Sequence, residues 1–151
     1  MSVTRVTTTA HYEHQYPHLK FSVFTQAAIH PATGDCHRTA IGSCLQIDPR
    51  TLTNYAECGD DWHMVCLREL AAHGWIAYWV PTDKPNRNQS PTGWMVASVP
   101  SKSFKGKWHS VVVDSDLRLI HDPNWNTPRR QVRRSAIRDL LIFEPLPKED
   151  E

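Results

Sequence analysis

Apolar and polar residues first alternate in the segment from residue 19 to residue 25. Leu19, Phe21 and Val23 share one face of this segment, which is the pattern of a half-buried strand. We expect residues 1–18, which precede the strand, to form a loose arm.

Two later segments carry apolar residues at the spacing of an α-helix. The first begins near Cys36 and ends before Pro49, and its apolar positions are Ala40, Ile41, Cys44 and Leu45. The second runs from Trp62 to His73 and stops at Gly74, a residue that commonly follows the last helical turn. Asp60 and Asp61 precede this helix, and we expect them to cap its N-terminus.

The second half of the chain predicts strands separated by polar turns. They are expected at residues 75–80, 93–99, 108–113 and 117–120, with a closing strand at residues 141–146. Asp114-Ser115-Asp116 forms a tight hairpin turn between two of them. We expect a late helix at residues 133–140 and a disordered tail at residues 147–151. Helices followed by a meandering antiparallel sheet indicate the α+β class.

Length and charge narrow the class of protein. With 151 residues, the chain is expected to form a single domain over residues 1–151. Its 17 Lys and Arg residues nearly balance its 16 Asp and Glu residues, which gives no argument for nucleic acid as the main partner. No apolar run reaches the roughly 20 residues that cross a bilayer. We therefore expect a soluble, cytoplasmic protein without a membrane partner, with its four cysteines reduced and its oligomeric state open.

Cys36 stands where a Gly/Pro-rich loop meets the first turn of the first helix. Unpaired N–H groups and the positive end of the helix dipole stabilise an anion at such a position. A thiol with an ordinary pKa of about 8.5 is only a few per cent ionised at neutral pH, so a nucleophilic cysteine also needs an imidazole. His109, at the start of the strand expected over residues 108–113, is the candidate partner.

A third group must orient the imidazole, and Asp122 is the first choice for this role. His109 begins one strand of the predicted hairpin and Asp122 ends the other, so the two side chains can lie beside each other. Strand alternation places His121 and Asp122 on opposite faces, so only one of them points at Cys36. Asn124 remains an alternative orienting residue.

Four motifs, taken in chain order, resemble the papain-like cysteine peptidase superfamily, nearest to small stand-alone C39-like proteins of bacteria and phages. The motifs are residues 35–45, the helix from Asp61-Trp62 to His73-Gly74, residues 109–113, and His121-Asp122-Pro123. The resemblance implies a cysteine at the head of a central helix packed on an antiparallel sheet. It also implies a thiol-dependent hydrolase of the peptidase or isopeptidase type, which acts on a protein or peptide through a thioester. Acyltransferases and deamidases of the same superfamily are alternatives, and we expect no cofactor.

The oxyanion formed during such a reaction needs hydrogen-bond donors, and the backbone N–H of Cys36 is well placed to be one. In papain-like enzymes the second donor is often a glutamine a few residues before the nucleophile, where this chain has His30. Gln26 lies further upstream. Both His30 and Gln26 stay candidates for the second donor.

A second functional class stays open, namely a catalytically silent binding module on the same fold. Such a module would hold a protein partner through the polar loop of residues 81–92 or the arginine-rich run of residues 129–138. Cys58, His63 and Cys66 are the tightest group of potential metal ligands, but their spacing does not match a usual zinc pattern. We therefore expect no metal.

Overall fold

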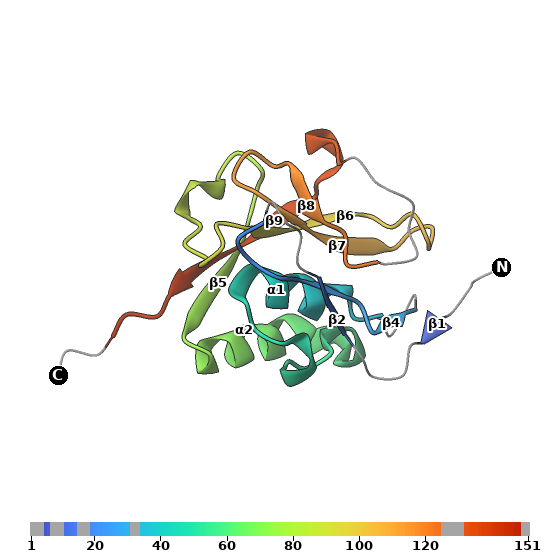
Figure 1. The fold of residues 1–151 in the computed structure, drawn as a ribbon, viewed down its shortest axis with the longest axis horizontal. Coiled ribbons are helices and arrows are strands. Elements are labelled where there is room, and N and C mark those ends of the chain that lie inside the picture. The colour runs from blue at the N-terminus through green and yellow to red at the C-terminus, as the bar shows by residue number, and fades with distance from the viewer. Residues whose placement is uncertain (1–4, 7–10, 15–18, 31–33, 125–131, 149–151) are drawn as a thin grey trace.

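The computed structural model describes the chain except for residues 1–4, 7–10, 15–18, 31–33, 125–131 and 149–151 (Figure 1). A five-stranded antiparallel sheet forms its centre, with the strand order β5-β9-β6-β7-β8. The strands are β5 (Trp75–Val80), β6 (Met95–Pro100), β7 (Trp108–Val113), β8 (Leu119–His121) and β9 (Asp139–Pro145). These strands arise where the sequence pattern predicts them, apart from the start of β9.

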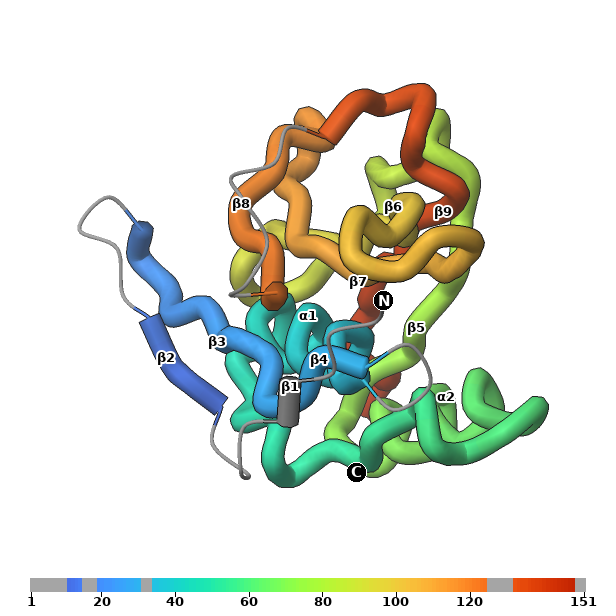
Figure 2. Tube along the Cα trace, turned by 90° about the vertical axis from the view of Figure 1, so that its right-hand side faces the viewer, coloured from blue at the N-terminus to red at the C-terminus, as the bar shows by residue number. Residues whose placement is uncertain are grey.

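Two α-helices, α1 (Cys36–Leu45) and α2 (Trp62–Ala72), lie on one face of this sheet (Figures 1 and 2). Helix α1 packs against β6 and β7, and α2 packs against β5. Short 3₁₀ segments occupy the connections, and they are η1 (Pro49–Thr51), η2 (Tyr55–Glu57), η3 (Gly59–Asp61), η4 (Pro85–Arg87) and η5 (Arg134–Ala136). Helices in the first half and an antiparallel sheet in the second confirm the α+β class. No helix among the described residues is long and apolar enough to cross a bilayer.

Strand alternation divides the buried side chains between the two faces of the sheet. Toward the helices, the cluster combines sheet and helix residues, including Val96, Val112, Phe143, Ile41 and Leu70. On the opposite face, the cluster includes Met95, Ala97, Val111, Ile142 and Leu117. Because both faces are covered, the central strands carry buried apolar residues on both faces. Helix α1 is thus held against the sheet by a continuous core.

The N-terminal segment differs from the expected loose arm wherever it is described. Strand β1 (Arg5–Val6) pairs with β4 (Ala28–Ile29), and β2 (Tyr12–His14) pairs with β3 (Val23–Thr25). Strand β3 covers only the end of the segment in which a strand was expected. It packs on α1, where the Phe24 N–H donates to Ser43 Oγ at 2.9 Å. The expectation of a loose arm was wrong over residues 5–6 and 12–14, because these strands are paired with residues further along the chain; residues 1–4, 7–10 and 15–18 of that arm lie outside the described residues.

The late helix expected at residues 133–140 was also wrong. Only the short segment η5 is helical there, and β9 begins at Asp139. The run Leu140–Phe143 is fully buried and pairs with β5 on one side and β6 on the other. A position between two strands favours extended backbone, so the expected closing strand begins two residues earlier than predicted and lies inside the sheet.

The start of α2 differs from the expected capping arrangement. Asp61 makes no side-chain cap hydrogen bond, and η3 leads directly into the helix. At the other end of the chain, Pro147 and Lys148 belong to no regular element, and residues 149–151 of the expected tail lie outside the described residues.

Candidate active site

Cys36 is the first residue of α1, and the residue before it connects this helix to the preceding strand. The buried side chain of Asp35 makes no cap hydrogen bond to its own helix. It accepts instead from the backbone N–H groups of residues 27 and 28, at 3.4 and 3.0 Å. Its Oδ2 also lies 2.6 Å from His11 Nε2 and 3.2 Å from Arg38 Nη2. Asp35 therefore fastens the segment around β4 to the head of α1, beside the thiol.

Strands β7 and β8 bring His109 and Asp122 together. His109 Nε2 donates to Asp122 Oδ1 across 2.6 Å, and the backbone N–H of Asn124 donates to the same oxygen at 2.9 Å. Asp122 thus orients the imidazole, whereas Asn124, the alternative candidate, orients the carboxylate. His121 is buried and its Nε2 donates to the Phe24 carbonyl at 2.9 Å, so it faces away from the site as strand alternation predicts.

The charges of Cys36 and His109 stabilise each other. Desolvation would raise the pKa of Cys36, but the positive charge and hydrogen bond of His109, with hydrogen bonds from the backbone and hydroxyl of Ser110, lower it below its ordinary value. Desolvation would likewise lower the pKa of His109, but the charge of Cys36 and the hydrogen bond to Asp122 raise it to about 10. Both directions favour a thiolate–imidazolium pair at neutral pH.

Ser110 and His37 also belong to this group, although the sequence did not single them out. His37 Nδ1 and Ser110 Oγ are hydrogen-bonded at 3.0 Å, and Ser110 in turn donates to Cys36. Burial lowers the pKa of His37 to about 4, so this second imidazole is neutral at physiological pH. Each is the chain neighbour of a predicted site residue, since His37 follows Cys36 and Ser110 follows His109. That adjacency was the one available signal.

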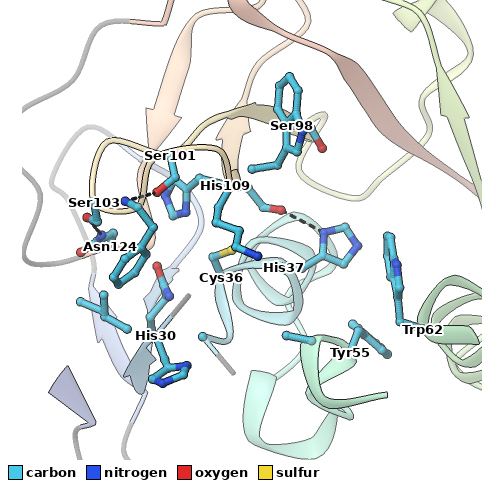
Figure 3. A pocket seen from close by; sticks show the side chains of 18 of the residues that line it. His30, Cys36, His37, Tyr55, Trp62, Ser98, Ser101, Ser103, His109 and Asn124 are labelled. Carbon is cyan, nitrogen blue, oxygen red and sulfur yellow. Dashed lines mark hydrogen bonds between the residues drawn. The ribbon is translucent and has the colours of Figure 1, made fainter. Parts of the chain in front are cut away.

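A cleft of about 640 Å³ opens over the thiol, and both candidate oxyanion donors line it. Figure 3 shows Cys36 and His109 in its middle, with His30 on one side and His37 on the other. Gln26 is buried, and its Nε2 donates to the Ala28 carbonyl at 2.9 Å. Because a primary amide carries two N–H groups, Gln26 keeps one for a substrate oxygen. The structure brings both candidates to the cleft without choosing between them.

An aromatic wall closes one end of the cleft around His37. The ring centroid of His37 lies 5.4 Å from that of Trp62, 6.0 Å from that of Tyr55 and 6.5 Å from that of Trp79. Tyr55 is fully buried, and Trp62 is partly exposed at the rim. These rings surround His37, whose burial keeps its imidazole neutral.

The other cysteines lack the surroundings of a nucleophile. All four cysteines are free, and burial raises the pKa of both the Cys44 and the Cys66 thiol. The Cys58 thiol donates to the Asn54 carbonyl at 3.7 Å. Within the described part of the chain, no group of three or more His, Cys, Asp or Glu residues is arranged to hold a metal ion.

Comparisons with known proteins found no match to this chain. No profile of a protein family matches the chain, and neither does a curated protein sequence or a solved structure.

Proposed function

We propose that this protein is a thiol-dependent hydrolase of the peptidase or isopeptidase type, with Cys36 as the nucleophile. One observation carries the proposal: a cysteine at a helix N-terminus is hydrogen-bonded to an imidazole whose other nitrogen binds a carboxylate at 2.6 Å. This is the arrangement of an activated nucleophile, its base and an orienting acid. The pKa directions of Cys36 and His109 support the same roles.

In the first half of the reaction, Cys36 makes the bond to the substrate and His109 transfers the proton. The Cys36 thiolate attacks the amide carbonyl carbon and forms a C–S bond, while the carbonyl π electrons move to oxygen. Collapse of this intermediate breaks the C–N bond, and His109 gives its Nδ1 proton to the leaving amine. Nε2 stays hydrogen-bonded to Asp122, which stabilises the imidazolium. A thioester and neutral His109 remain.

Water then completes the cycle. Neutral His109 accepts a proton from a water molecule as the water oxygen attacks the thioester carbon. The C–S bond breaks, a carboxylic acid leaves, and the thiolate–imidazolium pair is restored. A substrate amine in place of water would give transfer instead of hydrolysis, so the access of water to the thioester decides the outcome.

The oxyanion is the third charge that the site must stabilise. The N–H of Cys36 lies in the first turn of α1, where backbone donors have no intrahelical partner. Gln26 or His30 supplies the second donor from the cleft wall. Loss of one such donor typically costs about 3 kcal/mol of transition-state stabilisation, a decrease of about a hundredfold in rate.

The arrangement also supports the proposed membership of the papain-like superfamily. Helix α1 carries the cysteine at its head and packs on an antiparallel sheet that carries the histidine and the acid. The chain order is cysteine, histidine, acid, as in the resemblance drawn from the motifs. The order and the helix position are the basis of this assignment.

Cleavage of a complex peptide mixture tests the proposed function. Wild-type protein, Cys36→Ala and Cys58→Ala are incubated with proteome-derived peptides, and new termini are identified by mass spectrometry. We expect wild type and Cys58→Ala to generate the same new termini, and Cys36→Ala to be slower by about a thousandfold or more. Cleavage that survives in Cys36→Ala would contradict the proposal, as would a wild-type protein that produces no new termini.

A further inference from the structure

The two lips of the cleft carry opposite charges. One lip is the loop that joins β6 to β7, together with Arg138, the residue just before β9. We call it the basic lip, and its cationic side chains, all exposed, are Lys102, Lys105, Lys107 and Arg138. Lys107 and Arg138 line the cleft itself. Asp139, which follows Arg138 in the chain, also lines the cleft and is half-buried.

The facing lip is acidic. It consists of residues 55–63, which run from η2 through η3 into α2. Glu57, Asp60 and Asp61 are exposed there, next to Ala56 and Trp62, which line the cleft, while the three acids themselves lie outside its lining; this stretch contains no Lys or Arg. Ser101 and Ser103 of the basic lip and Tyr55 and Trp62 of the acidic lip lie on opposite sides of Cys36 in Figure 3.

The basic lip is held in place by its own hydrogen bonds. The Ser101 N–H donates to the Lys107 carbonyl at 2.9 Å, and the Phe104 N–H donates to Ser101 Oγ at 3.1 Å. The Arg138 guanidinium lies 5.0 Å from the ring centroid of Trp108, whose side chain is half exposed. Ordered loops lose little conformational entropy on binding, so the cations are already placed for a ligand.

We infer that the basic lip binds an acidic segment of the substrate polypeptide, on one side of the bond that Cys36 attacks. The inference rests on the proposed function for what happens at Cys36, but the binding itself does not. Carboxylates would pair with Lys107 and Arg138 beside the flat face of Trp108. The acidic lip repels a continuous polyanion across the whole cleft, which favours a peptide with a local acidic stretch over a nucleic acid strand.

Peptide binding to the Cys36→Ala protein tests this inference without turnover. Two fluorescein-labelled peptides of equal length, one rich in Glu and one with Gln at the same positions, are compared by fluorescence anisotropy at low salt. We expect the Glu peptide to bind about five- to tenfold tighter, and added salt to weaken that preference. The double substitution Lys107→Gln/Arg138→Gln should abolish the preference.

A matched control separates the basic lip from net charge. Arg68 and Lys84 are exposed and do not line the cleft, and Arg68→Gln/Lys84→Gln removes the same total charge. This control should keep the preference for the Glu peptide. Equal binding of the two peptides, or equal loss of preference in both double variants, would overturn the inference. So would an oligothymidylate of similar charge that binds tighter than the Glu peptide and is released by the lip substitutions, because the surface would then be a nucleic acid site.

Alkylation of wild-type Cys36 distinguishes failure of the inference from failure of the proposed function. Iodoacetamide is neutral and reports the thiolate, whereas iodoacetate is anionic and also reports the local potential. We expect Lys107→Gln/Arg138→Gln to slow iodoacetate about two- to fourfold relative to iodoacetamide. An unreactive thiol with normal Glu-peptide binding would leave the inference standing and remove the proposed function. A reactive thiol whose ratio of iodoacetate to iodoacetamide rates is the same in wild type and in Lys107→Gln/Arg138→Gln would remove the inference and leave the proposed function standing.

Discussion

Replacement of Asp35 by asparagine should destabilise the fold strongly, because this carboxylate is buried among donors. Its side chain is fully inaccessible, whereas that of its partner Arg38 is 19% exposed. The carboxylate accepts from two backbone N–H groups, from Arg38 Nε at 3.3 Å and from Arg38 Nη2 at 3.2 Å. Asparagine keeps the shape but turns one acceptor oxygen into a donor that faces other donors.

The size of the effect follows from these contacts. Breaking a buried ion pair by removing one partner costs about 3 to 5 kcal/mol. The partial exposure of Arg38 places Asp35→Asn near the lower limit, at about 3 kcal/mol of unfolding free energy. An ordinary domain has an unfolding free energy of roughly 5 to 15 kcal/mol, so this loss is a large part of it.

Urea denaturation followed by tryptophan fluorescence measures this loss, since the chain has six tryptophans. The pH dependence of the unfolding free energy shows whether the loss comes from the charge of the Asp35 carboxylate. Burial would raise the pKa of Asp35, but the hydrogen bonds and the positive charges of His11 and Arg38 lower it below its ordinary value. Stability from a lowered carboxyl pKa is present above about pH 4 and is lost as the pH falls through the folded-state pKa. The difference between wild type and Asp35→Asn should therefore shrink in acid.

Asp48→Asn provides the control. Asp48 Oδ2 lies 2.6 Å from Arg50 Nη2, closer than the 3.2 Å between Asp35 Oδ2 and Arg38 Nη2, but the side chains of Asp48 and Arg50 are 37% and 58% exposed to solvent. Exposed ion pairs contribute little, so the loss should be several times smaller than for Asp35→Asn. Equal losses for the two variants, or a loss at Asp35 that does not change with pH, would refute the reasoning.

Other substitutions test single contacts of the site and the core. Ser110→Ala should raise the pKa of the Cys36 thiol, because one donor to the thiolate is lost, and thiolate absorbance would show it. Asp122→Asn should lower the pKa of His109 from about 10 by roughly 1 to 2 units, measured by NMR titration of the imidazole. Gly42→Ala should destabilise the fold by about 1 to 3 kcal/mol in urea denaturation, since its Cβ would lie 2.5 Å from the Ile47 carbonyl oxygen. An unchanged value in any one of these measurements would remove the contact it tests from the account.

Local pattern was enough to predict the elements whose partners are close in sequence. The helix that begins at Cys36 and the hairpin around residues 114–116 follow from apolar spacing and turn chemistry. The hairpin also explains why His109 and Asp122 were predicted to lie together, since adjacent strands bring their ends into contact.

Elements that depend on distant partners were missed. Strands β1 and β2 are two and three residues long, too short to show a pattern, and exist because β4 and β3 pair with them. The run that forms β9 is apolar at successive positions, and a short apolar run does not distinguish a buried helix from a central strand. Its place between β5 and β6, where both neighbours pair with it, makes this run a strand.

In the site, too, the residues that depend on distant partners were missed. Cys36, His109 and Asp122 were singled out because their residue types suggest a known chemistry, and the structure brings the three side chains into contact. Ser110 is a common residue in a strand, and only the packing of α1 on β7 brings its hydroxyl to His37 and the thiol. Asp35 looks in sequence like an ordinary helix cap, but its side chain points instead to the segment before the helix.

The central claim is that Cys36 and His109 form a thiolate–imidazolium pair, and selective alkylation tests it most directly. The protein is treated with limiting iodoacetamide from pH 5 to pH 9 (about one-unit steps), and the modified residue is located by peptide mapping in wild type and His109→Ala. An ordinary thiol of pKa about 8.5 is only about 0.3% ionised at pH 6. We predict that Cys36 reacts selectively below pH 7 in wild type and loses this reactivity in His109→Ala. Slow alkylation of all accessible cysteines that rises only above about pH 8, or full reactivity of Cys36 without His109, would contradict the account.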